Sequence, residues 1–244
     1  MTDGRSRLKG PKLIVALDVG TAAEAVDICD RLLPDVDFFK VGLGLFCAEG
    51  PKIIKSLKDR GALVFLDLKL HDIPAQVEQA TRVIGTYGVD MVTVHCLGGP
   101  AMLAAAKAGI DSGAKEANHL PPMVVGVTIL TSLDGSDLEE MGVNGNVARE
   151  VGILAGLAKD AGLNGVVASA DETAMIRSES TGDFIIVTPG IRPAWARSSA
   201  DQKRVMTPGE AKAAGASFLV VGRPVIAASD PKAAARRIIE EIEK

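Results

Sequence analysis

Residues 62–74 read ALVFLDLKLHDIP, an apolar run that becomes charged and then ends at a proline. Side chains of a strand alternate between its two faces, so Leu66, Leu68 and Leu70 fall on one face and Asp67 and Lys69 on the other. An ion pair at the end of a buried strand is costly unless it is paired and used. Asp72 adds an acid beyond what one structural pair needs. The stretch therefore predicts a buried strand that carries a lysine held charged between carboxylates, ready to deliver a proton.

The same arrangement of apolar run, turn and helical pattern recurs along the chain. The predicted strands are 13–17, 38–43, 63–68, 91–94, 123–130, 165–168, 184–187 and 218–221. The predicted helices are 21–33, 50–60, 74–87, 100–112, 147–161, 171–178, 208–214 and 231–243. This alternation over 244 residues favours a single (β/α)8 TIM barrel, an α/β fold, over an open doubly wound sheet. No stretch resembles a linker, so we predict one domain over residues 1–244, with 134–146 as a mobile loop.

Composition excludes several classes of partner and location. Aromatic residues make up only 3% and the net charge is −4, which argues against a base-stacking surface and against a basic field for nucleic acid or membrane. Three cysteines without CxxC spacing are typical of reduced thiols in a cytoplasmic protein. The first ten residues have no apolar core of a signal peptide, and no apolar run reaches the length of a membrane span.

Polar residues stand at the ends of the predicted strands, where barrels of this type carry their chemistry. They are Asp18, Lys40, Asp67, Lys69, His95, Thr131, Ser169, Arg192 and Arg223. Unlike charges about 4 Å apart hold one another ionised, by about 4 kcal/mol at an effective dielectric near 20. Lys69 then stays an ammonium, suited to act as an acid and not as a Schiff-base amine. A purely structural ion pair, with Asp72 as a helix N-cap, is the competing interpretation, and the nearby Lys40 and Asp18 weigh against it.

Two Gly/Arg turns follow the last two predicted strands. Residues 189–193 read PGIRP and residues 222–224 read GRP. Barrels often bind phosphate between these two loops, where glycine lets backbone N–H groups approach and arginine offers a planar fork. The alternative is a pair of surface arginines. We predict a phosphate site formed by Arg192, Gly222 and Arg223, with Gln202 in the polar segment between the turns folding over it.

Cofactor signals are absent from the sequence. The three histidines, His71, His95 and His119, have no ligand spacing, so we predict no transition-metal site. The histidine pattern does not exclude a hard cation, such as Mg²⁺, bound by carboxylates. No glycine pair opens a helix with the GxGxxG spacing of a dinucleotide site. The sequence therefore predicts neither a metal nor a cofactor.

The run DLKLHDIP at 67–74 closely resembles the signature of the bacterial orotidine 5'-phosphate decarboxylases. Matching segments follow in the right order over nearly the whole chain, at 16–18, 40–42, 94–95, 130–132, 188–193, 201–204 and 221–224. The resemblance implies a cofactor-free barrel that converts orotidine 5'-monophosphate to UMP and CO2 in pyrimidine biosynthesis. It also implies a homodimer.

The resemblance further implies roles for the charged residues. Lys69 is similar to the proton donor to C6 of the pyrimidine, and Asp67 to the carboxylate that faces the departing CO2. Asp72 resembles the acid that one subunit supplies to its partner's site. Lys40 and Asp18 resemble the ligands of the ribose hydroxyls, with Lys40 also part of the charged chain.

Substrate contacts are implied in the same way. Thr131 resembles the residue that contacts the pyrimidine. The residues that resemble the family's phosphate ligands are Arg192, Gln202, Gly222 and Arg223. Ile73 and Gln76 correspond to further substrate contacts. The family often reads DIPNT where residues 72–76 read DIPAQ, so Gln76 replaces the threonine that reaches the partner's ribose. An amide can still donate and accept there, on a longer side chain.

Two other functions compete with this prediction. Magnesium-dependent 3-hexulose-6-phosphate synthases and 3-keto-gulonate-6-phosphate decarboxylases share the Asp-x-Lys-x-x-Asp strand. They place an acid at the end of strand two, where this chain has Lys40, and a cation there opposes a divalent metal. The non-enzymatic alternative is a barrel that only binds a phosphorylated ligand.

Overall fold

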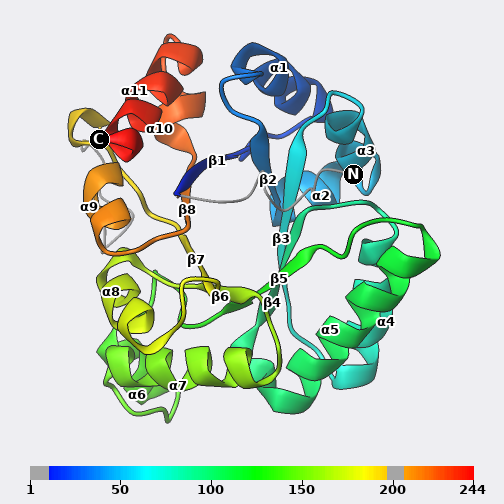
Figure 1. The fold of residues 1–244 in the computed structure, drawn as a ribbon, viewed down its shortest axis with the longest axis vertical. Coiled ribbons are helices and arrows are strands. Elements are labelled where there is room, and N and C mark those ends of the chain that lie inside the picture. The colour runs from blue at the N-terminus through cyan, green and yellow to red at the C-terminus, as the bar shows by residue number, and fades with distance from the viewer. Residues whose placement is uncertain (1–10, 197–205) are drawn as a thin grey trace.

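Eight parallel strands close into a barrel in the order β1 to β8, as the computed structural model of residues 11–196 and 206–244 shows (Figure 1). The strands are β1 Lys12–Ala16, β2 Phe38–Gly42, β3 Leu63–Leu70, β4 Met91–His95, β5 Met123–Val127, β6 Gly165–Val167, β7 Ile185–Thr188 and β8 Phe218–Val221. Each strand is hydrogen-bonded to the next, and β8 returns to β1. The predicted (β/α)8 barrel is confirmed.

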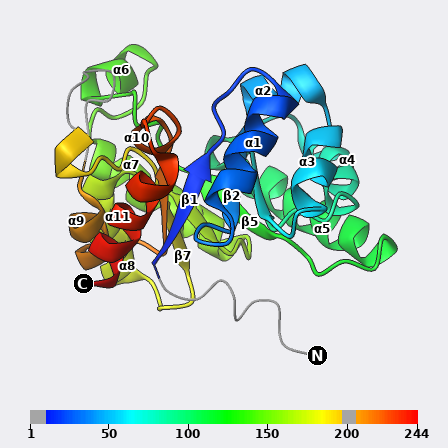
Figure 2. The same ribbon diagram turned by 90° about the horizontal axis from the view of Figure 1, so that it is seen from above.

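Helices surround the barrel and connect its strands (Figures 1 and 2). They are α1 Ala22–Leu32, α2 Leu43–Glu49, α3 Lys52–Lys58, α4 Pro74–Gly85, α5 Gly99–Glu116, α6 Gly135–Glu140, α7 Val147–Asp160, α8 Ala170–Glu179, α9 Pro208–Ala213, α10 Arg223–Ile226 and α11 Pro231–Glu243. The starts follow local chemistry: Thr21 and Glu24 form a capping box on α1, and prolines open α4, α9 and α11. None of the helices in the described residues is long and apolar enough to cross a membrane.

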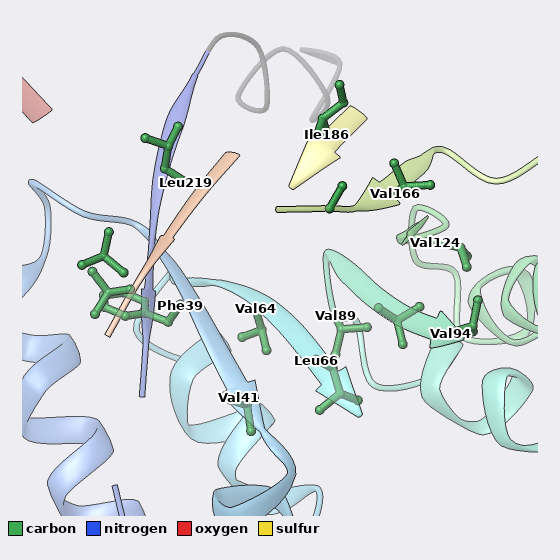
Figure 3. Close-up of a cluster of buried hydrophobic side chains, with 14 of the residues drawn as sticks. Phe39, Val41, Val64, Leu66, Val89, Val94, Val124, Val166, Ile186 and Leu219 are labelled. Atoms are coloured by element: carbon green, nitrogen blue, oxygen red, sulfur yellow. The ribbon is translucent and has the colours of Figure 1, made fainter. Parts of the chain in front are cut away.

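The barrel separates two apolar clusters. Inward-facing residues form the smaller one, in which the rings of Phe38 and Phe218 meet edge to face with centroids 5.7 Å apart. Outward-facing residues pack against the helices, among them Val64, Leu66 and Val94, as Figure 3 shows. Alternation along each strand produces both clusters. The inner cluster fills the barrel below the carboxyl ends of the strands, so side chains at those ends face an open mouth.

Helices α4 and α5 lie side by side (Figures 1 and 2). At three glycines their backbones approach more closely than a side chain would permit. A Cβ atom at Gly85 would lie 2.6 Å from the carbonyl oxygen of Ile110, and Gly109 and Gly113 leave similarly little room on α5. Because α4 begins directly after the charged end of β3, this close packing fixes the segment that carries Asp72.

The structure corrects several predicted boundaries. Strand β5 ends at Val127, although the apolar run continues to residue 130, because Ile129 and Leu130 line a cavity and do not extend the sheet. The predicted loop 134–146 contains α6, capped by Asp134. Two further short helices, α2 and α10, were not predicted; α2 begins where β2 ends and has no side-chain cap, and α10 starts inside the predicted Gly/Arg turn.

Candidate active site

The charged end of β3 departs from regular strand geometry. Lys69 has a φ of +52°, a left-handed value that residues other than glycine rarely adopt, and the register with β4 shifts between Leu66 and Leu70. The Nζ atom of Lys69 nevertheless lies 2.8 Å from Oδ1 and 2.9 Å from Oδ2 of Asp67. The sequence correctly places these two side chains together, but on a bulged strand and not on the regular one that alternation predicts.

Two neighbouring strands extend this ion pair into a chain of alternating charges. The Nζ atom of Lys40, at the end of β2, lies 3.6 Å from Oδ2 of Asp67 and 3.2 Å from Oδ1 of Asp18, which follows β1. The side chains of Lys40 and Asp67 are only 12% and 11% exposed, whereas that of Asp18 is 59% exposed. Charges this buried are tolerated when each has an opposite partner. The structure therefore brings together Asp18, Lys40, Asp67 and Lys69, as predicted.

A cavity of about 140 Å³ opens beside these charges in the mouth of the barrel. Its lining comes from six of the eight strands and the loops that follow them: Lys40, Phe65, Asp67, Lys69, Val127, Ile129, Leu130, Thr131, Val167, Ala168, Val187, Pro189 and Val220. Lys40, Asp67 and Lys69 form one charged side, and the β5–β7 side is almost wholly apolar. Thr131 lies at the cavity as predicted, four residues after β5 ends. The space can hold a small group that is polar on one side and apolar on the other.

A second cavity, of about 250 Å³, lies between the loops after β7 and β8. Arg192 and Arg223 both line it, and Arg192 is only 7% exposed. Trp195 forms another wall, with the guanidinium of Arg237 stacked 4.4 Å from its ring centroid. Two arginines facing one cavity fit an anion with several oxygens. The predicted Gln202 lies outside the described residues.

Gly222 lies between residues of the two cavities, because Val220 lines the first and Arg223 the second. A Cβ atom at this glycine would lie 3.3 Å from Oδ2 of Asp18, so the turn after β8 closely approaches the charged chain. Gly222 also immediately precedes Arg223. One elongated ligand can therefore extend from the charged cavity to the arginines.

The segment after β3 contributes to neither cavity of this chain. Asp72, Ile73 and Gln76 are exposed, and none of them lines either cavity of this chain. Oδ1 of Asp72 accepts a hydrogen bond from the N–H of Ile73 at 2.7 Å, and Asp72 forms no ion pair with any described residue. Ile73 itself is the N-cap residue of α4, so the interpretation of Asp72 as the N-cap is wrong.

His95 and His71 form a stacked pair next to the charged end of β3. Their ring centroids are 5.3 Å apart and their planes differ by 23°. Nδ1 of His95 is buried and has no hydrogen-bond partner among the described residues. Burial lowers the pKa of His95, and the neighbouring His71 and Lys69 lower it further. The pair therefore favours a neutral His95 beside the lysine.

Thr93 is the site residue that the sequence analysis missed. Its Oγ1 donates a hydrogen bond to Oδ1 of Asp67 at 3.0 Å and accepts one from the backbone N–H of Lys69 at 2.8 Å. The available signal was a hydroxyl inside the apolar run of β4, two residues before His95.

Metal ligands do not gather in the described parts of the chain. Across residues 11–196 and 206–244, no group of three or more His, Cys, Asp or Glu side chains is arranged to hold an ion. The charged chain itself alternates acids with lysines, and an ammonium next to each carboxylate repels a divalent cation. Independence from metals stays a prediction.

The fold and the site together are those of a (β/α)8-barrel enzyme, which carries its ionisable groups at the carboxyl ends of the strands. Residues 11–238 match the family described as Orotidine 5'-phosphate decarboxylase / HUMPS. The chain belongs to this family. Because the description joins two groups, membership alone does not choose between the predicted decarboxylase and its alternatives.

Individual relatives narrow the comparison. The chain is 50% identical over 233 residues to an orotidine 5'-phosphate decarboxylase from Moorella thermoacetica, covering 95% of this chain and 92% of that protein. One from Carboxydothermus hydrogenoformans is also 50% identical, over 95% of this chain and 96% of that protein. The crystal structure of orotidine 5'-phosphate decarboxylase from Lactobacillus acidophilus superposes with a TM-score of 0.85 at 39% identity, over 96% and 100% of the two chains.

Proposed function

We propose that this protein is a carboxy-lyase that converts orotidine 5'-monophosphate to UMP and CO2 in pyrimidine biosynthesis. Relatives of this name match over nearly the whole chain, which favours this activity over the magnesium-dependent alternatives. The observation that carries the proposal is the Lys69 ammonium, 2.8 Å from Asp67 on the charged side of a cavity whose other side is mainly apolar. Arginines in the adjoining cavity supply a place for a phosphate.

The chemistry asks for one localised positive charge. When the bond between C6 and the carboxylate breaks, its electron pair stays on a ring carbon that has no cofactor to delocalise it. A fixed cation stabilises that carbanion electrostatically, most strongly where water is excluded. In the proposed mechanism Lys69 is this cation, and a proton from its Nζ then forms the new C6–H bond. Asp67 faces the departing carboxylate, and Lys40 keeps that acid paired from the other side.

The rest of the substrate binds along the mouth of the barrel. We assign the pyrimidine to the apolar side with Thr131, the ribose hydroxyls to Asp18 and Lys40, and the phosphate to Arg192, Gly222 and Arg223, with Gln202 completing the grip. Binding the phosphate far from C6 supplies energy for excluding water and positioning the reacting carbon.

The proposal includes a homodimer in which Asp72 serves the partner's site. Asp72, Ile73 and Gln76 are exposed, and Ile73 leaves 63% of its surface open. A second copy packed on this segment would cover the isoleucine and bring a carboxylate and an amide to the neighbouring cavity. The cytoplasm is the proposed location, supported by three cysteines that are all free. We treat the chain as one barrel domain whose partners are its substrate and a second copy, without nucleic acid or membrane.

Loss of orotidine 5'-monophosphate absorbance in the presence of EDTA is the direct test. The wild-type chain should decarboxylate at full rate with the chelator, whereas Lys69→Ala should show no turnover. Lys55→Ala is the matched control, because Lys55 pairs with Asp59 on the surface of α3, away from the site. Inhibition by EDTA would favour a magnesium enzyme, and UMP binding without CO2 release would favour a binding protein.

Mixed subunits test the shared site. Lys69→Ala and Asp72→Ala homodimers should each be inactive, and mixing them should restore part of the activity, because one of the two sites in a heterodimer then has both residues intact. Unchanged inactivity after verified subunit exchange would contradict the assignment of Asp72 to the partner's site.

A further inference from the structure

Thr93 contacts both members of the central ion pair from beneath. The residue is fully buried on β4 and is not part of the cavity lining. Its hydroxyl gives its proton to Oδ1 of Asp67 at 3.0 Å and accepts the backbone N–H of Lys69 at 2.8 Å. A hydroxyl has one proton and two lone pairs, so it can make both bonds at once. Thr93 therefore ties the carboxylate to the backbone of the lysine.

The bulge in β3 explains why this tie is needed. Leu66 pairs with Val92 and Leu70 with Val94, so residues 67–69 of β3 lie opposite Thr93 alone. A strand that carries extra residues loses ladder hydrogen bonds locally, and its side chains are re-aimed. Here the Thr93 side chain accepts the Lys69 N–H in place of a regular ladder bond. The left-handed φ of +52° at Lys69 belongs to the same distortion.

The hydroxyl also restricts the carboxylate. Oδ1 of Asp67 accepts from Thr93 and from Nζ of Lys69, while Oδ2 faces Lys40 at 3.6 Å. Without the threonine proton, the carboxylate can rotate about its last side-chain bond and still touch both lysines. With it, one rotation is favoured, and the position of the Lys69 ammonium is set relative to a fixed acid.

We propose that Thr93 is a positioning residue for the decarboxylation, holding the bulged backbone of Lys69 and the rotation of Asp67 so that the ammonium meets C6. The inference rests on the proposed function. The competing explanation is that the hydroxyl only satisfies buried polar groups and contributes to folding. The two explanations differ in what removal of the hydroxyl does to kcat, KM and the geometry of Lys69.

Three variants separate these explanations. Thr93→Val keeps the shape and removes the hydroxyl, and Thr93→Ser restores it. Thr81→Val is the matched control: Thr81 is also fully buried, but its hydroxyl binds the carbonyl oxygen of Val77 within α4. Because misplacing a reacting group by about 1 Å can cost 100-fold in rate, we expect Thr93→Val to lower kcat on the order of 10- to 100-fold. KM should change little, Thr93→Ser should recover most of the rate, and Thr81→Val should keep the wild-type kcat.

A structural readout accompanies the kinetics. In a crystal structure of Thr93→Val, the Lys69 backbone should leave the left-handed region or the Asp67 carboxylate should rotate away from its wild-type position. This readout does not depend on turnover, so a wild-type protein without decarboxylase activity would refute the proposed function while the geometry still decides the role of Thr93. Wild-type kcat with unchanged geometry in Thr93→Val would overturn the inference, as would an equal loss of kcat in Thr81→Val. If the valine variant does not fold, Thr93→Ala is judged by the same criteria.

Discussion

The two sides of the barrel mouth differ in polarity: one is charged and the other is apolar. The side formed by β2 and β3 presents Lys40, Asp67 and Lys69, each within 4 Å of an opposite charge. The side formed by β5, β6 and β7 presents mainly aliphatic groups, such as Val127, Val167 and Val187. Parallel strands of the same barrel thus end in a charged wall and an apolar wall of one cavity.

The difference separates chemistry from stability. Buried ion pairs contribute little net stability, because desolvation offsets their attraction. Buried valines stabilise the fold by removing apolar surface from water. Under the proposed function, the charged wall therefore acts on the substrate, and the apolar wall contacts the substrate ring and packs in the core. Changes in the charged wall should cost activity more than stability, and changes in the apolar wall should do the reverse.

Lys69→Met should have the largest effect, and that effect should be a loss of activity without a loss of stability. Loss of the acid and of its electrostatic stabilisation should lower kcat by at least about 10⁴-fold. Asp67 keeps Lys40 and Thr93 as partners, and the Lys69 side chain is 33% exposed, so the free energy of unfolding should change by less than about 1 kcal/mol. Steady-state kinetics and urea unfolding measure the two quantities. A variant that unfolds easily would show that the charged wall is structural.

Arg223→Ala should come next, and its effect should fall on binding. Losing charge-assisted hydrogen bonds to a phosphate costs about 1.5–3 kcal/mol, which corresponds to a KM about 10- to 100-fold higher. Orotidine without its phosphate is the discriminating substrate, since the variant and the wild type should turn it over at equal rates. An equal loss of turnover with both substrates would mean that Arg223 acts in catalysis together with the charged wall and not in phosphate binding.

Val187→Thr tests the apolar wall. Val187 is fully buried and belongs to the inner cluster, so a hydroxyl of nearly the same size would lie without a built-in partner. Burial of such a group costs about 1–3 kcal/mol, and the free energy of unfolding should fall by that amount. Catalysis should fall less than in the lysine variant. Val83→Thr is the control, because Val83 is 47% exposed on α4 and should tolerate the change.

Much of both walls follows from sequence patterns. Apolar runs separated by helical patterns predict every strand, because each buried strand must be apolar on both faces in a parallel barrel. The strand ends then locate Asp18, Lys40, Asp67 and Lys69 without any coordinates. Thr21 and Glu24 have the spacing of a capping box, which is typical of a helix start, and α1 begins there. These features depend on residues close in sequence or on the repeating topology.

Other features depend on contacts that patterns do not encode. Nothing in the letters around Lys69 signals a left-handed lysine, because the bulge arises from the register between β3 and β4. The role of Thr93 could not be predicted for the same reason, because it depends on the position of Thr93 opposite that bulge. The helix α6 did have a readable sign: Asp134 and Asp137 form a capping box at the usual spacing. In the proposed homodimer, the position of Asp72 relative to a cavity depends on a second chain.

His95, at the rim of the charged wall, should give the smallest effect, confined to acid pH. Its pKa is lowered in the folded protein, first by burial and then by His71 and Lys69, whereas the unfolded chain titrates near 6.5. The unfolded state therefore binds more protons as the pH falls below about 6.5, and the free energy of unfolding decreases toward the lower folded pKa. His95→Gln, which cannot titrate, should flatten this part of the stability curve measured by urea unfolding. His119→Gln, at an exposed position, should leave the slope unchanged. An identical acid slope in wild type and His95→Gln would contradict a lowered pKa of His95 in the folded protein.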